Sequence, residues 1–169
     1  IKETLKPFMV ELMTGDINQR RAILDQHFFA PKISTARKLY PVTETVKEID
    51  GVYTEVFTPA EGVSPQQANK VLINLHGGGF SMGARTEGRL ESIPVASVAG
   101  MRIVSVDYRQ GPEHQFPAAS EDVATVYRHL LKHYPAANIG IFGCSAGGLL
   151  TAQSVAWFAA NDLPQPGAI

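Results

Sequence analysis

The strongest constraint on the fold of this 169-residue chain is the run Gly143 to Gly148, which reads Gly-Cys-Ser-Ala-Gly-Gly. It follows an apolar, β-branched stretch and precedes a stretch of helix-forming residues. A serine on a sharp strand-to-helix turn needs small neighbours, because a Cβ on either side would strike the adjoining strand or helix. The turn places the hydroxyl over the first turn of a helix, where backbone N–H groups favour negative charge. The run therefore predicts a nucleophile elbow centred on Ser145.

A glycine-rich loop lies upstream of this elbow. The apolar strand predicted over Val71 to Leu75 leads directly into His76-Gly77-Gly78-Gly79-Phe80. Three consecutive glycines let the backbone turn its N–H groups into a cleft, as stabilisation of a developing oxyanion requires. A phosphate-binding loop is disfavoured, because no Gly-Lys-Ser/Thr follows the glycines. A flexible linker would not lie between a buried strand and Phe80. The loop thus predicts an oxyanion hole.

Together these motifs resemble the hormone-sensitive lipase-like family of α/β-hydrolase esterases. The similarity rests on the glycine loop, on the elbow and on a signature between them, which comprises Asp107-Tyr108-Arg109, Pro112-Glu113-His114, Phe116-Pro117-Ala118-Ala119 and Glu121-Asp122. It extends clearly from about Val71 to Leu150 and more loosely through the N-terminal part. One departure is Cys144, where many members carry an acidic residue or threonine. We expect its side chain to point away from the attacking face.

The resemblance implies a role for each motif residue. Ser145 is expected to be the nucleophile. The backbone N–H groups of Gly78, Gly79 and Ala146 are expected to form the oxyanion hole, and His76 and Gly77 to support its loop. The expected substrate is a small-molecule ester.

A nucleophilic serine also needs a histidine and an acid, which in α/β-hydrolases follow it in the order serine, acid, histidine. The residues after Ser145 contain no histidine, and their only acid is Asp162, expected at the far end of the following helix. We therefore expect the chain to be the front half of an enzyme, completed by a second polypeptide or by a remaining C-terminal half. The last residues, Pro166 to Ile169, are expected to lead into a further strand.

Other candidate groups are assigned structural roles. His129 and His133 lie four residues apart on one helical face, but no third ligand follows in a zinc-protease pattern, which disfavours a metal site. Glu121 and Asp122 diverge on a helix, so we expect them to cap it or to bind the preceding loop. By the resemblance, Asp107 is expected to brace its loop.

Composition limits the partners. The chain is 44% hydrophobic and 18% charged with a formal net charge of −1, and it has no basic stripe, which argues against nucleic acid. No apolar run reaches membrane-spanning length, and nothing in the sequence predicts a cofactor. Its one cysteine excludes an internal disulfide. A cytoplasmic location is favoured.

The predicted fold class is α/β: an α/β-hydrolase fold with a mostly parallel sheet, helices on both faces, absent last strands and an N-terminal helical cap. Residues 1–30 are predicted to be cap helices, ending at Pro31, and residues 31–169 the N-terminal portion of the hydrolase domain. The expected strands are Thr43–Ile49, Val52–Thr58, Val71–His76, Arg102–Asp107 and Ile139–Gly143, the first two joined by a tight turn at Asp50-Gly51. The expected helices are Leu5–Met13, Asp16–Phe28, Gly88–Ala99, Ala119–Tyr134 and Ala146–Asn161.

Two functional hypotheses follow. The first is a serine carboxylic-ester hydrolase. The second is a non-hydrolytic small-molecule binding protein on an esterase scaffold, as in the plant gibberellin receptors. The residue in the position of the triad histidine, outside this sequence, would distinguish the two.

Overall fold

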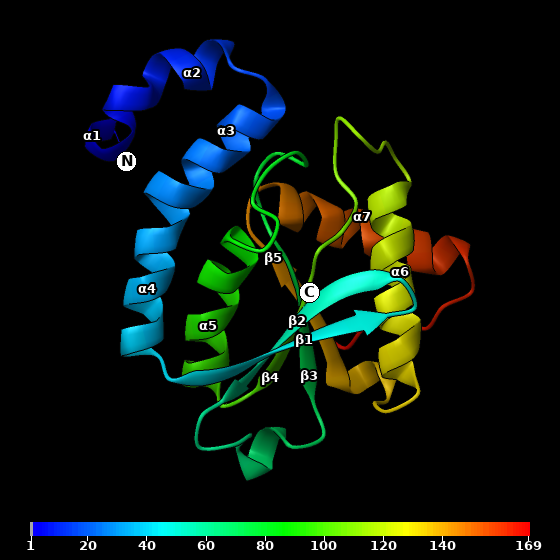
Figure 1. The fold of residues 1–169 in the computed structure, drawn as a ribbon. Coiled ribbons are helices and arrows are strands. Elements are labelled where there is room, and N and C mark those ends of the chain that lie inside the picture. The colour runs from blue at the N-terminus through cyan, green and yellow to red at the C-terminus, as the bar shows by residue number, and fades with distance from the viewer. Residues whose placement is uncertain (1) are drawn as a thin grey trace.

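The computed structural model describes residues 2–169, which form one five-stranded sheet with helices on both of its faces (Figure 1). The strands are β1 Val42–Ile49, β2 Val52–Pro59, β3 Val71–Leu75, β4 Arg102–Val106 and β5 Ile139–Gly143. The α-helices are α1 Lys2–Leu5, α2 Met9–Thr14, α3 Ile17–Leu24, α4 Ala30–Leu39, α5 Glu87–Ala99, α6 Ala118–Leu131 and α7 Ala146–Ala160. The shorter helical turns are η1 Lys6–Phe8, η2 Asp25–Phe29, η3 Pro65–Gln67 and η4 Ala136–Asn138.

The sheet order is β1-β2-β4-β3-β5. β1 and β2 form the predicted antiparallel hairpin, in which Ile49 pairs with Val52 across a turn whose two residues, Asp50 and Gly51, have positive φ. β2 pairs antiparallel with β4, while β3 is parallel to both β4 and β5. The sheet is therefore mixed, with a parallel core, as expected for the predicted α/β class.

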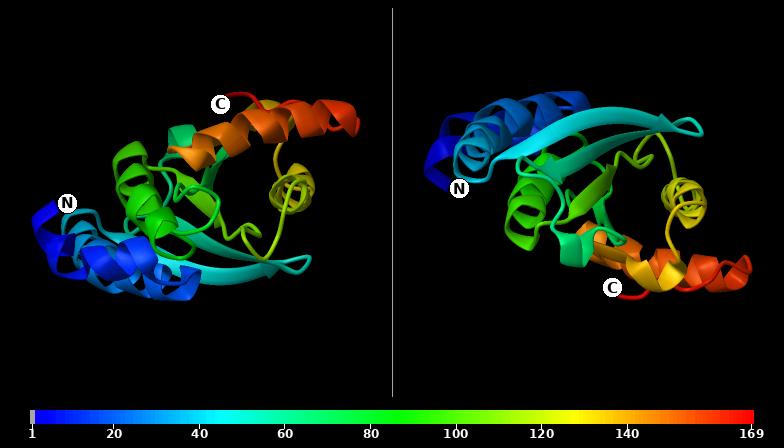
Figure 2. Two further views of the ribbon diagram at one scale, coloured as in Figure 1. Left: turned by 90° about the horizontal axis from the view of Figure 1, so that it is seen from above. Right: turned by 90° about the horizontal axis from the view of Figure 1, so that it is seen from below.

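Neighbouring residues on the strands serve opposite faces. On β2, Val56 packs with the helices α6 and α7, whereas Phe57 packs with α4 and α5. On β4, Val104 likewise packs on the side of α6 and α7, and Ile103 on the side of α4 and α5. Views along the sheet show α5 on one side and α6 on the other (Figure 2). The inner strands β2, β3 and β4 are thus buried on both faces, which is typical of a parallel sheet, whereas most of the edge strand β1 is exposed.

The C-terminal residues continue the sheet beyond β5. Ala168 forms a parallel bridge with Gly140, and the Ile141 N–H donates to the Ala168 carbonyl at 3.0 Å. This pairing agrees with the expectation that Pro166 to Ile169 lead into a further strand.

The expected end of the second N-terminal helix at Pro31 is wrong. The helical run continues through a π-turn, η2, into α4 and ends only near Leu39. At the π-turn, the Ala30 N–H donates to the Asp25 carbonyl. Pro31 therefore lies in the first turn of α4, where its missing N–H removes no hydrogen bond of the helix. The predicted boundary at residue 30 falls inside this run, and the division into a cap and a hydrolase portion stays a prediction.

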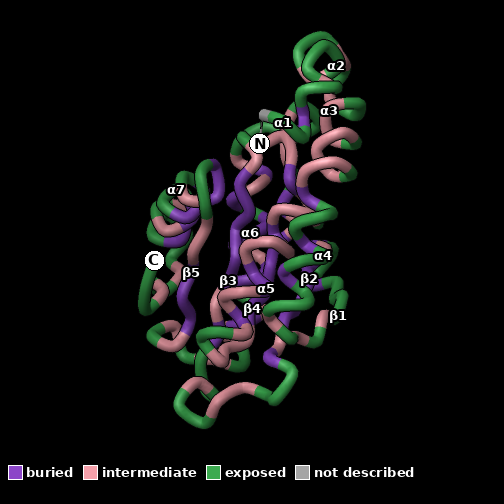
Figure 3. Tube along the Cα trace, turned by 90° about the vertical axis from the view of Figure 1, so that its left-hand side faces the viewer, coloured by how far each residue is buried: buried purple, intermediate pink, exposed green. Residues whose placement is uncertain are grey.

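The first N-terminal helix also differs from its expected form. It is interrupted at η1, where Pro7 stands, although it ends before Gly15 as predicted. Of its apolar stripe only Leu5 is buried, while the side chain of Met13 is 72% exposed. Figure 3 shows α2 mostly exposed at one end of the molecule, apart from the buried strands. Helical periodicity therefore located this element but did not indicate what covers it.

The packing of α6 on α7 gives a prediction about stability. Phe158 is fully buried and stacks on Tyr127 with ring centroids 4.3 Å apart. We expect Phe158→Ala to lower the free energy of unfolding by about 3–5 kcal/mol, because it leaves a cavity beside the sheet. Urea unfolding followed by circular dichroism measures the change. The control Leu149→Ala removes a side chain that is 63% exposed on the same helix and should change stability by less than about 0.5 kcal/mol. Equal losses would contradict this account.

Candidate active site

The elbow lies at the end of β5, where the strand passes directly into α7. Ser145 has φ 53° and ψ −118°, a conformation that L-residues rarely adopt. The N–H groups of Gly148 and Leu149 donate to its carbonyl at 3.1 and 3.2 Å, so the first turn of α7 begins at this residue. Strained backbone of this kind is concentrated at functional sites. The predicted strand-to-helix turn is therefore present with the strained serine at its apex.

Two glycines allow this turn to approach the neighbouring strand. A Cβ on Gly147 would collide with the Leu75 carbonyl oxygen and lie 2.8 Å from that of His76. A Cβ on Gly143 would also collide with the Leu75 carbonyl oxygen. These backbone contacts leave no room for any side chain. Because Leu75 and His76 lead into the glycine loop, the same contacts bring that loop beside the elbow.

The glycine loop follows β3 and folds tightly. Gly78 and Gly79 have φ 97° and 63°, and a Cβ on Gly78 would collide with the Met82 carbonyl oxygen. The Gly78 carbonyl accepts the N–H groups of Ser81 and Met82 at 3.1 and 3.0 Å. A Cβ on Gly77 would stand 3.1 Å from the Cys144 carbonyl oxygen. The residues expected to form the oxyanion hole thus lie on two segments that touch each other.

His76 is buried beneath this loop, with only 1% of its surface exposed. Its Nδ1–H donates to the Gly77 carbonyl at 2.7 Å, and its ring stacks on Tyr108 with centroids 4.3 Å apart. The Tyr108 hydroxyl donates to the His76 carbonyl at 2.6 Å. Burial lowers the pKa of His76, so the ring is neutral with its proton on Nδ1. These contacts are those of a residue that braces the loop.

Two acidic residues that the sequence analysis did not single out lie behind the loop on α5. Glu91 accepts the Gly77 N–H at 3.3 Å and the Asn74 side-chain amide at 2.7 Å. Burial, together with repulsion from Glu87, raises the pKa of Glu91 to about 7, although its hydrogen bonds with Asn74 and Gly77 oppose the shift. Burial also raises the pKa of Glu87. Both residues lie one helical turn apart on α5, but nothing in a single sequence indicates that they face a loop.

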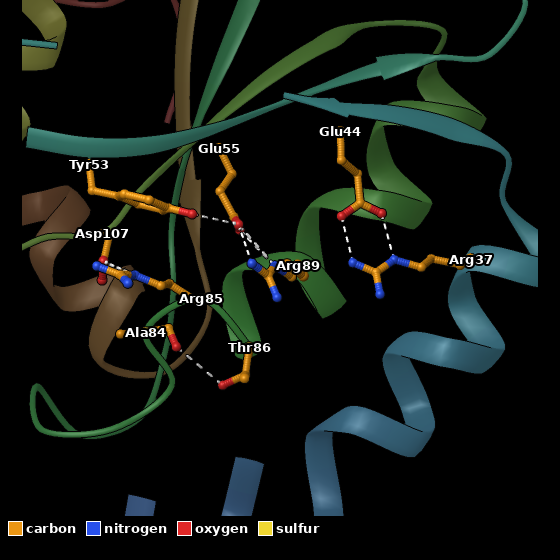
Figure 4. Close-up of polar contacts among 9 residues, drawn as sticks. All are labelled: Arg37, Glu44, Tyr53, Glu55, Ala84, Arg85, Thr86, Arg89 and Asp107. Atoms are coloured by element: carbon orange, nitrogen blue, oxygen red, sulfur yellow. Dashed lines mark hydrogen bonds and ion pairs between the residues drawn. The ribbon is translucent and has the colours of Figure 1, made fainter. Parts of the chain in front are cut away.

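The signature loop between β4 and α6 is braced as expected. Asp122, on α6, accepts the Arg109 N–H at 2.7 Å and its guanidinium Nε at 2.9 Å, which confirms the role expected for the Glu121-Asp122 pair. Asp107 accepts the Arg85 Nε at 2.7 Å and donates its N–H to the Tyr53 carbonyl. Figure 4 shows this ion pair beside Tyr53.

Other histidines lie on the N-terminal helical run and on α6. The ring of His27 stacks on Phe8 in the N-terminal helices, at 4.1 Å between centroids. His129 and His133 lie on α6, and no group of three or more metal-ligating side chains occurs among residues 2–169. In the same part of the chain, no helix is both long and apolar enough to span a bilayer.

A cavity of about 230 Å³ adjoins the glycine loop. Phe80, Phe116 and Gln153 line it, together with residues of the signature loop and the start of α6. The Gly111 N–H donates to the Phe80 carbonyl at 2.6 Å and so joins the two loops at the cavity. This concave space of modest size lies beside Phe80, the residue that follows the three glycines, and is large enough to hold a small chemical group.

Comparison with known proteins places these features in a family context. The family described as having the alpha/beta hydrolase fold matches residues 72–169. Versiconal hemiacetal acetate esterase of Emericella nidulans is 38% identical over 102 residues, which is 60% of this chain and 34% of that protein. An acetyl-hydrolase of Streptomyces hygroscopicus is 34% identical over 111 residues, 64% of this chain and 37% of that protein. The chain therefore spans about a third of the length of these relatives.

Solved structures give the same picture. An esterase from the bacterial hormone-sensitive lipase family superimposes with a TM-score of 0.73 at 28% identity, over 89% of this chain and 48% of that one. A hyperthermophilic esterase from Pyrobaculum calidifontis superimposes with a TM-score of 0.74 at 25% identity, over 95% of this chain and 53% of that one.

The close approach at the elbow gives a prediction with an adjacent control. We expect Gly147→Ala to lower the free energy of unfolding by about 3 kcal/mol or more, because the new Cβ would overlap backbone that cannot rotate away. The nearest atom to a Cβ on Gly148 is the Gly143 carbonyl oxygen at 3.4 Å. Gly148→Ala should be neutral or stabilise α7 by up to about 1 kcal/mol. Urea unfolding of both variants tests the contrast, and similar midpoints would contradict it.

The half-buried acid Glu91 behind the loop makes the stability of the protein depend on pH. Between the ordinary glutamate pKa of 4.5 and about 7, the folded protein retains a proton on Glu91 that the unfolded chain has released. The free energy of unfolding therefore falls as pH rises through this interval. In the variant Glu91→Gln, the free energy of unfolding should fall less between pH 5 and pH 8 than in the wild type, as measured by urea unfolding at both pH values. The control is Glu113→Gln, because Arg21 lowers the pKa of Glu113 to about 2, outside the interval. An unchanged slope in the Glu91 variant would refute this assignment.

Proposed function

This chain belongs to the alpha/beta hydrolase fold family, in its hormone-sensitive lipase-like group, and we propose that it is part of a carboxylic-ester hydrolase whose nucleophile is Ser145. The observation that carries the proposal is the strained serine between β5 and α7, packed against the glycine loop by contacts that only glycine permits. The names of relatives as esterases and acetyl-hydrolases support the same reaction class.

In the proposed reaction, the Ser145 Oγ attacks the ester carbonyl carbon. The carbonyl oxygen gains negative charge and accepts hydrogen bonds from the backbone N–H groups of Gly78, Gly79 and Ala146. Donors fixed in advance at this point stabilise the tetrahedral intermediate, and each one contributes about 3–4 kcal/mol to lowering the barrier. The alcohol leaves, and water then releases the acyl group from the serine oxygen.

The proton of the Ser145 hydroxyl needs an acceptor. His76 is a poor candidate, because it is buried and its protonated Nδ1 is bound to the Gly77 carbonyl. Asp162, the acid that follows the elbow, lies beyond the far end of α7. We therefore propose that a further polypeptide segment supplies the acid and the histidine, and that it pairs with the sheet beyond β5, where Ala168 has begun a parallel bridge.

We also propose that the acyl group is small. Several relatives are named for acetyl or acetate esters, among them an ethyl acetate hydrolase of Pseudomonas putida and an acetyl esterase of Salmonella schwarzengrund. The cavity of about 230 Å³ beside Phe80 is the candidate pocket for one side of the ester. We further propose that the predicted cap, residues 1–30, covers the site, since Asp25 accepts the hydroxyl of Thr86 at 2.7 Å.

The test is covalent labelling of the full-length protein that contains this chain. A fluorophosphonate probe should label Ser145, as identified by peptide mass spectrometry, and Ser145→Ala should abolish labelling. The control Cys144→Ala removes the neighbouring exposed thiol and should still label. The 169 residues alone should hydrolyse p-nitrophenyl acetate little or not at all. Labelling that persists without Ser145 would overturn the assignment, and a full-length protein that neither labels nor hydrolyses esters would favour a binding protein.

A further inference from the structure

Arg21 of α3 joins the N-terminal helices to both loops of the candidate active site. Its Nε donates to the Ser81 carbonyl at 2.7 Å, just beyond the glycine loop. Its Nη2 donates to the Gly111 carbonyl at 2.9 Å, in the signature loop. The side chain is only 21% exposed, so these bonds are largely shielded from water. One guanidinium thus spans two loops that meet at Phe80, the residue after the proposed oxyanion donors Gly78 and Gly79.

The same guanidinium is held from a third direction. The two oxygens of Glu113 accept Arg21 Nη1 and Nη2 at 2.6 and 2.9 Å, a two-point ion pair. This fork geometry matches guanidinium to carboxylate and orients the planar group. All three guanidinium nitrogens are therefore engaged, and the plane is fixed between the loops.

The loops that Arg21 contacts also bind each other. The Gly111 N–H donates to the carbonyl of Phe80, the residue next to Ser81. Phe80 itself has φ 59°, which a side chain other than glycine rarely adopts. Arg21 binds one carbonyl from each loop: that of Gly111, the donor of this bond, and that of Ser81, the residue after its acceptor. Its contacts therefore hold a strained segment immediately after Gly78 and Gly79.

We propose that Arg21 is a positioning residue for the proposed ester hydrolysis, one that fixes the glycine loop so that its N–H groups face the developing oxyanion. This inference rests on the proposed function. An exposed ion pair alone contributes little, but the acceptors here are backbone carbonyls of the segments that carry and adjoin the oxyanion donors. A displacement of about 1 Å in such donors lowers a rate by about 10²-fold.

The experiment compares variants of the full-length protein in p-nitrophenyl acetate hydrolysis. Arg21→Met should lower kcat by about 10- to 100-fold and leave KM within about twofold, because oxyanion donors act on the transition state more than on bound ester. Arg21→Lys should recover part of the loss, because one ammonium reaches fewer of the acceptors than a guanidinium. Glu113→Gln keeps both carbonyl contacts and should lose less activity than Arg21→Met.

Arg37 provides the matched control. It lies farther along the same helical run and forms a fork with Glu44 of β1, at 2.6 and 2.7 Å, away from both loops (Figure 4). Arg37→Met should keep kcat within about twofold. Equal changes of kcat in the Arg21 and Arg37 variants would overturn the inference.

Hydrogen exchange separates this inference from the proposed function. If the wild-type protein hydrolyses no ester, the proposed function fails, and exchange of the Gly111 amide becomes the deciding measurement. Arg21→Met should speed that exchange by about tenfold relative to Arg37→Met, since the bond to Phe80 loses its support. Unchanged exchange would show that Arg21 does not hold the loops.

Discussion

The site depends on one close approach of backbone to backbone, where the first turn of α7 meets the end of β3. Gly143 and Gly147 admit the Leu75 carbonyl at a distance that no Cβ would permit. Since β3 and β5 are parallel neighbours, with Leu75 paired to Gly143, their carboxyl ends finish at the same edge of the sheet. The segments that follow the two strands therefore meet. The order of the strands thus places the serine next to the glycine loop.

Two acidic side chains, Glu55 and Glu91, make polar contacts between α5 and the sheet or the glycine loop. Glu55 of β2 is buried and paired to Arg89 of α5, with Nε to Oε2 at 2.9 Å (Figure 4). Glu91 instead accepts hydrogen bonds from neutral donors, the side-chain amide of Asn74 and the N–H of Gly77. A half-buried carboxyl that is bonded to neutral donors is protonated more easily than one paired with a cation, and the raised pKa of Glu91 reflects this difference. The loop is thus held by a group whose charge depends on pH near neutrality.

Local patterns predicted much of the fold. The Asp50-Gly51 turn, the five strands and the helices α5, α6 and α7 follow from period-two and period-3.6 apolar spacing within a few residues of their ends. Prediction failed at Pro31, because a π-turn over Asp25–Phe29 lets the helical run pass through the proline. It was also incomplete for Met13, since periodicity marks an apolar face without showing whether another element covers it.

By itself the sequence determined the elbow and the glycine loop, because a serine flanked by glycines and three successive glycines after a strand each encode a local backbone geometry. Tertiary structure alone decided what holds them. Arg21 reaches acceptors 60 and 90 residues away, and Glu91 reaches Gly77 from the next helix. Such contacts depend on how β3, β4 and the N-terminal helices lie in space, and charged side chains carry no periodic signal that marks their distant partners.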